Sequence, residues 1–264
     1  MFSPELVRLL AILLAIIGAV FLSLGAQFQN DAVTKHHAPA QTRLGGLTLF
    51  QLSALALAPL IVVQPIGAVA LIITSILNAR IYKIRLNPKT FLAIGLTTLG
   101  VGGFVAFAAS SAVAVELSNQ KLLQVVGILF LLLMMFAFLF WRSKGQVTAL
   151  QYIFGAGVLY GFVASLAKVV LQRLFQQDYD LLTLLALASL IGATVLGGWF
   201  AQNAYSSGPP DLVIAGLTVI DPAVAVGIAI VILGEAEGAT MTQVIGFALA
   251  GLMAIAGVLT LNRV

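Results

Sequence analysis

One carboxylate lies deep within an apolar stretch of the chain. Asp221 is followed directly by Pro222, and both lie about ten residues into the apolar segment 212–234. At a rise of about 1.5 Å per residue, this depth is roughly 15 Å, near the middle of a bilayer. A carboxylate there must be paired, be protonated or face a cavity, because an unpaired charge in hydrocarbon costs several kcal/mol.

The Asp221-Pro222 pair is suited to two kinds of chemistry. Pro222 has no N–H, so it removes the hydrogen bond to a carbonyl one turn back, at Gly216 to Thr218, and permits a kink. A kinked helix with a carboxylate beside backbone carbonyls can hold a cation or an amine, or can shuttle a proton. The alternative is a structural role, in which a protonated Asp221 hydrogen-bonds a neighbouring helix.

A second apolar segment carries a matching polar group. Gln64 precedes Pro65 there in the same way as the aspartate precedes its proline. Gln64 either lines the same cavity as a neutral hydrogen-bonding group or simply hydrogen-bonds another helix. Weaker candidates for cavity or gate positions are Gln51, Tyr160, Gln27 and Asn203.

Lys168 is the cationic candidate within the apolar segments. It lies four or five residues from the expected outer end of segment 148–172. We expect its side chain to extend outward, toward Asp178 or Asp180, because long basic side chains place their charged ends at the interface. The alternative is that Lys168 acts as a counter-ion for Asp221 or for an anionic substrate.

The composition shows which medium these side chains occupy. Of the 264 residues, 61% are hydrophobic and 8% are charged, against roughly 45–50% and about 25% in soluble domains. A soluble fold cannot bury so much apolar surface, and neither disorder nor nucleic-acid binding tolerates so few charges. The chain has no cysteine, so disulfides and thiolate metal sites are excluded, and no metal site is expected from two adjacent histidines. We therefore expect an all-α polytopic membrane protein.

Nine apolar segments approach or exceed the length of about 20 residues that a membrane-spanning helix needs. Their expected bounds are 7–28, 44–59, 61–82, 90–110, 122–141, 148–172, 181–205, 212–234 and 240–262. The second is short and meets the third at Ala58-Pro59, where a tight turn is expected. The first is expected to be a retained span, because it has a long apolar stretch and no convincing cleavage site.

Basic residues predict the orientation of these spans. Most of the acidic residues fall on one side of the expected membrane, and most of the basic ones on the other. The basic side carries Lys35, Arg43, Arg80, Lys83, Arg85, Lys89, Arg142, Lys144 and Arg263. Since basic loops remain in the cytoplasm, the N-terminus is expected outside and the C-terminus inside a plasma (inner) membrane. An odd number of spans agrees with this orientation.

Two stretches of the chain look like copies. Each has a proline within an apolar helix, Pro65 in the first and Pro222 in the second, and each continues through a polar loop to a Gly-x-x-x-x-Gly helix. The first loop is basic and the second acidic, so the copies are expected to have opposite orientations in the membrane. Similar apolar composition is the alternative explanation. We expect one domain, 1–264, made of a first repeat at about 7–110, a linking helix at about 122–141 and a second repeat at about 148–262.

These features resemble the drug/metabolite transporter superfamily, and within it the NIPA-like and EamA-like branch. Besides Pro65 and Pro222, the resemblance rests on Ile232-Leu-Gly-Glu235 and Ile245-Gly246, which are similar to the family's apolar-Gly-Glu and glycine-rich last helix. It implies a transporter with an unpaired helix between two inverted repeats. The first copy departs from this pattern, because Asn78-Ala-Arg stands where the second copy has Leu-Gly-Glu. Equivalent glutamates in the two copies are therefore not expected.

Three classes of function remain. The first is a secondary transporter of small solutes by alternating access, coupled to protons or ions through Asp221; the resemblance implies magnesium as one substrate. The second is a flippase for an amphipathic or lipid-linked substrate, which apolar cavity walls would suit. The third is a non-transporting membrane subunit. Enzymatic activity is not expected, because no His, Cys or acid pair converges in the spans, and we expect no cofactor and no partner beyond lipid and a small-molecule, cationic or lipid-linked substrate.

Overall fold

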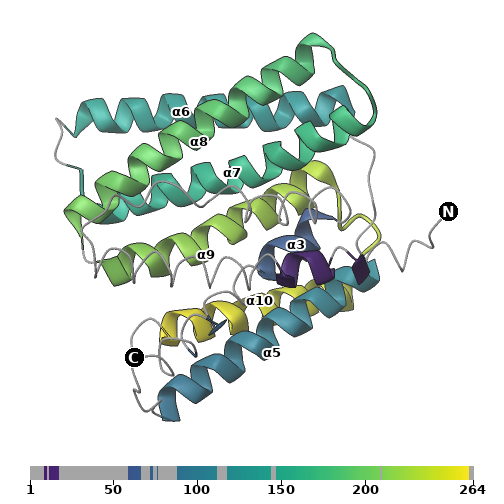
Figure 1. Cartoon of the computed structure of the whole chain (residues 1–264), viewed down its shortest axis with the longest axis vertical. Coiled ribbons are helices and arrows are strands. Elements are labelled where there is room, and N and C mark those ends of the chain that lie inside the picture. Colours follow the sequence, from purple (N-terminus) through teal and green to yellow (C-terminus); the bar gives the residue numbers. More distant parts are fainter. Residues whose placement is uncertain are drawn as a thin grey trace. The chain divides into compact units, whose positions relative to one another are not determined.

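In the computed structural model of the chain (Figure 1), the regular structure of the described residues is entirely helical. These residues are 9–10, 12–17, 59–66, 72–73, 76, 88–111, 118–143, 147–208 and 210–261, without the side chains of 109, 210, 211, 214, 215 and 261. The helices are α3 (Leu60–Ile66), α5 (Pro88–Ser111), α6 (Asn119–Arg142), α7 (Ala149–Phe175), α8 (Leu181–Ser207), α9 (Pro210–Ile228) and α10 (Met241–Leu261). A π-helix, η1 (Ala229–Leu233), continues α9.

Six stretches of helix are long and apolar enough to cross a membrane. They are Pro88–Ala108, Asn119–Arg142, Ala149–Phe175, Leu181–Ser207, Gly216–Leu233 and Met241–Thr260. They coincide with the last six of the nine expected spans, so a multi-pass membrane protein is confirmed. The three earlier spans, expected at 7–28, 44–59 and 61–82, lie largely outside the described residues.

Polar side chains fix where several of these helices begin. The Oγ of Ser118 accepts a hydrogen bond from the backbone of Lys121 at the start of α6. Thr148 and Gln151 form a reciprocal capping box at the start of α7. The same Thr-x-x-Gln spacing recurs at Thr240, before α10, with the same pair of hydrogen bonds. These caps satisfy donors that the first turn of a helix leaves without partners.

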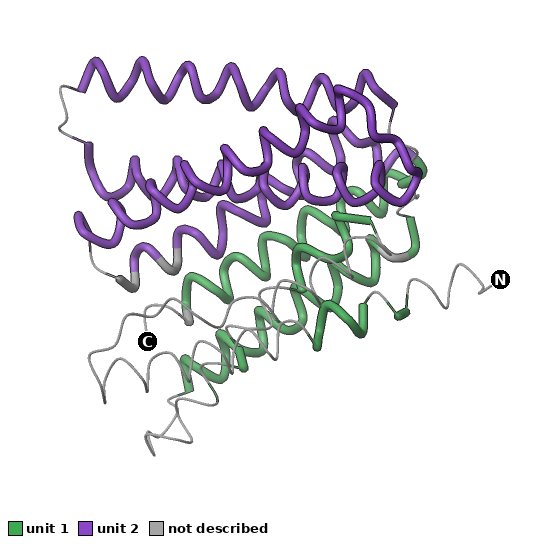
Figure 2. The backbone as a smooth tube through the Cα atoms, turned by 45° about the horizontal axis from the view of Figure 1, so that its top comes forward, with its two compact units in different colours: residues 1–112, 238–264 green, residues 113–237 purple. Residues whose placement is uncertain are grey.

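The chain forms two compact units (Figure 2). One unit contains residues 1–112 and 238–264, and so holds α3, α5 and α10; the other contains 113–237, and so holds α6 to α9 with η1. The boundaries of these units differ from those of the expected repeats. The second expected repeat groups α10 with α7 to α9, whereas α10 belongs to the unit that holds α3 and α5. In each unit, a small number of close helix pairs positions the polar groups.

In the first unit, α5 and α10 pack closely as an antiparallel pair. A Cβ added to Gly100 would lie 2.7 Å from the Cα of Ala254, and one added to Gly257 would lie 2.9 Å from the carbonyl oxygen of Ala93. Later residues of α5 thus meet earlier residues of α10, and the Gln243 amide donates to Ser110 Oγ at 3.2 Å. Glycine permits this approach because it has no side chain to separate the two backbones.

We expect Gly100→Ala to lower the free energy of unfolding by about 1–3 kcal/mol, because the added methyl group overlaps the α10 backbone. Gly95→Ala, on the same helix, is the matched control, since a Cβ at Gly95 meets nothing within 4 Å. Equilibrium unfolding of the purified protein in mixed micelles measures both changes. Equal stability of the two variants would contradict the close packing.

In the second unit, α7 lies between α8 and α9 and is largely buried. A Cβ added to Gly157 would lie 2.7 Å from the Cβ of Ile220, and one added to Gly161 would lie 2.7 Å from the Cβ of Val224. The residue numbers rise together, so α7 and α9 run parallel, as expected for two spans separated by one returning helix. This contact positions the helix that carries Asp221.

Candidate functional site

Asp221 lies near the middle of the continuous helix formed by α9 and η1, with Pro222 inside that helix. Its Oδ1 atom is buried and has no hydrogen-bond partner among the described residues. An unsatisfied buried carboxylate oxygen is costly, so native proteins keep one where a ligand, a proton or a moving donor reaches it. The expectation that both prolines lie within apolar helices is confirmed, because Pro65 lies inside α3.

Helix α7 brings a tyrosine close to Asp221. A Cβ added to Gly157 of α7 would lie 3.5 Å from the backbone nitrogen of Asp221, so the two helices touch at this level. Tyr160, one turn further along α7, interacts electrostatically with both Asp221 and Tyr205 of α8. The sequence indicates Tyr160 only as a weaker cavity candidate. The structure places Tyr160 on the part of α7 that meets the Asp221 helix.

Lys168 forms a buried ion pair with Glu235. Its Nζ lies 2.7 Å from Oε1 of Glu235, and the two side chains are 13% and 3% exposed. The expectation that Lys168 reaches Asp178 or Asp180 is therefore wrong. The physical reason is that α7 and α9 run parallel, so the residues just after η1 lie beside the last turns of α7.

A second lysine holds the same end of α9. Gly234 ends η1 with a φ of 75°, and the backbone N–H of Glu235 donates to Ala229 O at 2.9 Å. Lys121 Nζ donates to Leu233 O at 2.7 Å. Glycine suits this position because a side chain is strained at positive φ. The Leu-Gly-Glu sequence thus ends the helix and places Glu235 next to Lys168.

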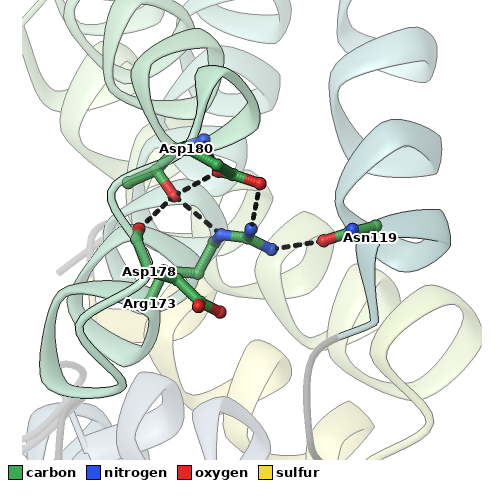
Figure 3. Close-up of polar contacts among 5 residues, drawn as sticks. Asn119, Arg173, Asp178 and Asp180 are labelled. Carbon is green, nitrogen blue, oxygen red and sulfur yellow. Dashed lines mark hydrogen bonds and ion pairs between the residues drawn. The ribbon is translucent and has the colours of Figure 1, made fainter.

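Arg173 joins three helices at the same end of this unit (Figure 3). Its guanidinium donates to Asn119 Oδ1 at 2.8 Å, to Asp180 Oδ2 at 2.9 Å and to Thr183 Oγ1 at 2.8 Å. Arg173 is 2% exposed, so nearly all of its charge is satisfied inside the protein. This contact ties α6, α7 and the start of α8 together.

Asp180 has a pKa below its ordinary value, chiefly because the backbone N–H of Thr183 donates to its carboxylate. Burial opposes this effect, while the Thr183 hydroxyl and Arg173 add to it. A lowered folded-state pKa gives stability above the unfolded-state pKa, and this stability is lost as the pH falls through the folded-state value.

We therefore expect Asp180→Asn to lower the thermal midpoint of unfolding at neutral pH. We also expect the midpoint of this variant to fall less, between neutral and acid pH, than that of the unmodified protein. The exposed Asp178→Asn is the control, because Asp178 joins this cluster through its backbone atoms, which the substitution leaves unchanged. Thermal unfolding in detergent at neutral pH and near pH 3 measures both variants. The same acid sensitivity in Asp180→Asn as in the unmodified protein would rule out this contribution.

The remaining expected site residues are spread over both units. Gln64 is buried in α3 beside Pro65, in the first unit. Asn203 lies in α8 of the second unit, where its Nδ2 donates to Trp199 O at 2.7 Å. Gln27 and Gln51 lie outside the described residues. Within the described ranges, no three His, Asp or Glu side chains gather as a metal site would require.

The chain was compared with protein-family models, with curated proteins and with solved structures, and no match was found in any of the three.

Proposed function

We propose that the chain is a secondary transporter of small solutes that works by alternating access and is coupled to protons or ions through Asp221. The observation that carries the proposal is the buried Oδ1 of Asp221, which lacks a partner among the described residues, in the middle of an apolar, proline-containing helix. A group that binds and releases a cation must spend part of its cycle without a protein partner. A purely structural carboxylate is expected to keep a fixed donor.

The pairing of α5 with α10 in the first unit supports an inverted-repeat architecture of nine spans. In such a repeat, equivalent helices of the two copies run in opposite directions. The two Gly-x-x-x-x-Gly helices, α5 and α10, are antiparallel, as that relation requires. In the proposed arrangement the N-terminus lies outside and the C-terminus in the cytoplasm of the plasma membrane, as the basic residues indicate.

Uptake into proteoliposomes, with and without a pH gradient, tests the proposal. Magnesium, amines, sugars and prenyl-linked sugars are supplied separately to vesicles with and without the protein. We expect a soluble solute or ion to accumulate faster when the gradient is present. Movement of only the prenyl-linked sugar would favour a flippase, and no movement of any substrate would favour a non-transporting subunit.

A further inference from the structure

Tyr160 lies on the part of α7 that meets the Asp221 helix. Gly157 and Gly161, on either side of it in the sequence, make the closest approaches of α7 to Ile220 and Val224. Residues three or four positions apart share one face of a helix, so Tyr160 lies next to this contact. Its electrostatic interaction with Asp221 agrees with that placement.

The ring of Tyr160 rests against α8. A Cβ added to Gly197 would lie 3.1 Å from Cε1 and 3.2 Å from Cδ1 of the ring, which is tighter than an ordinary contact. Gly197 therefore leaves room for the ring in its present orientation. The adjacent Gly198 faces open space, since a Cβ there meets nothing within 4 Å. Substitutions at these two glycines therefore distinguish an effect on the Tyr160 ring from a general effect on α8.

We propose that the Tyr160 hydroxyl donates a hydrogen bond to Asp221 when this carboxylate is charged and releases it when the carboxylate is protonated. The hydroxyl is the donor that the buried Oδ1 lacks among the described residues. Tyr160 keeps its own proton throughout, and the proton that Asp221 binds comes from the aqueous phase. The role of this hydrogen bond in coupling rests on the proposed function, because it concerns the same carboxylate.

Other charged or titratable groups of the second unit are placed less well for this role. From α8, Tyr205 interacts with Tyr160. Lys168 follows Tyr160 by eight residues, about 12 Å along the helix, and is paired with Glu235. Tyr160, which lies on α7 with its ring against α8, is thus the better placed donor for Asp221.

The test is a carboxyl-carbon NMR titration of the full chain, labelled with ¹³C-aspartate, in lipid nanodiscs. Loss of one signal in Asp221→Asn assigns the carboxylate. We expect Tyr160→Phe to raise the titration midpoint of Asp221 by about one pH unit, because removing a donor to the charged form favours the protonated form about tenfold. Gly197→Ala is expected to move it in the same direction, and Gly198→Ala to leave it unchanged.

An unchanged midpoint in Tyr160→Phe would overturn the inference, as would a shift found in Tyr205→Phe alone. Both tyrosine variants keep their rings, and the Gly197 variant keeps the hydroxyl, so a folding defect in one leaves the others informative. Proton-driven uptake by the same variants tests the proposed function separately. If the NMR midpoint moves while uptake is absent or independent of pH, the hydrogen bond stands and the coupling role of Asp221 fails.

Discussion

Replacing Asp221 with asparagine is expected to abolish solute accumulation driven by a pH gradient, to the level of protein-free vesicles. The amide nearly matches the carboxyl group in size, and it removes a buried oxygen that lacks a partner among the described residues, so the fold is expected to persist. An amide does not take up and release a proton at the pH values on either side of the gradient. Exchange of solute at equal pH on both sides is therefore expected to remain in part.

Uptake, exchange and unfolding measured on the same preparation separate coupling from structure. The exposed Asp178→Asn, outside the helices, is the matched control and is expected to transport normally. If Asp221 has only a structural role, asparagine will transport normally as well, with an unchanged pH profile. In that case Asp221→Leu would lower stability by about 1–3 kcal/mol, because the donor that a structural carboxylate requires would be left unsatisfied.

Breaking the buried pair of Lys168 and Glu235 is expected to lower the free energy of unfolding by about 3–5 kcal/mol, as measured in mixed micelles. Lys168→Met leaves the Glu235 carboxylate without its partner, and Glu235→Gln leaves the Lys168 ammonium without its partner. In the native protein the two groups lie 2.7 Å apart in a site with little exposure to solvent. A charge without its partner there loses both hydration and attraction. The double variant Lys168→Met/Glu235→Leu is expected to recover most of the loss, because two apolar side chains need no partner.

The neighbouring pair of Lys121 and Glu237 provides the control. These charges are 3.8 Å apart, and the Glu237 side chain is 71% exposed, so water competes with the contact. Glu237→Gln is expected to change stability little, because exposed ion pairs contribute little. Equal losses in Glu237→Gln and Glu235→Gln would show that burial does not strengthen the inner pair.

The long helices could be predicted from the sequence because their length and composition are set locally. The span expected at 122–141 is helix Asn119–Arg142, and the span expected at 148–172 is helix Ala149–Phe175. The structure adds a few residues at the helix ends. Polar side chains such as Ser118 continue the hydrogen bonding beyond the apolar stretch, and hydropathy alone does not register them.

The position of Asp221 within its helix was also predictable, but its neighbours were not. Tyr160 approaches it because Gly157 and Gly161 bring α7 close to α9, which is a contact between distant parts of the chain. Glu235 was identified only as part of a family-like motif. Its pairing with Lys168 depends on the parallel direction of two helices and on the turn at Gly234. Such contacts arise from packing and leave no periodic signal in the sequence.

The pairing of Lys168 with Glu235 has an electrical consequence. A membrane potential does work on a moving charge, about 2.3 kcal/mol per elementary charge for each 100 mV crossed. A bonded cation and anion that move together experience opposite forces, and these nearly cancel. The end of α9 held by this pair could therefore shift across a membrane field with almost no electrical work. If the proposed transport takes place, we expect its voltage sensitivity to come from Asp221 and the cation bound there.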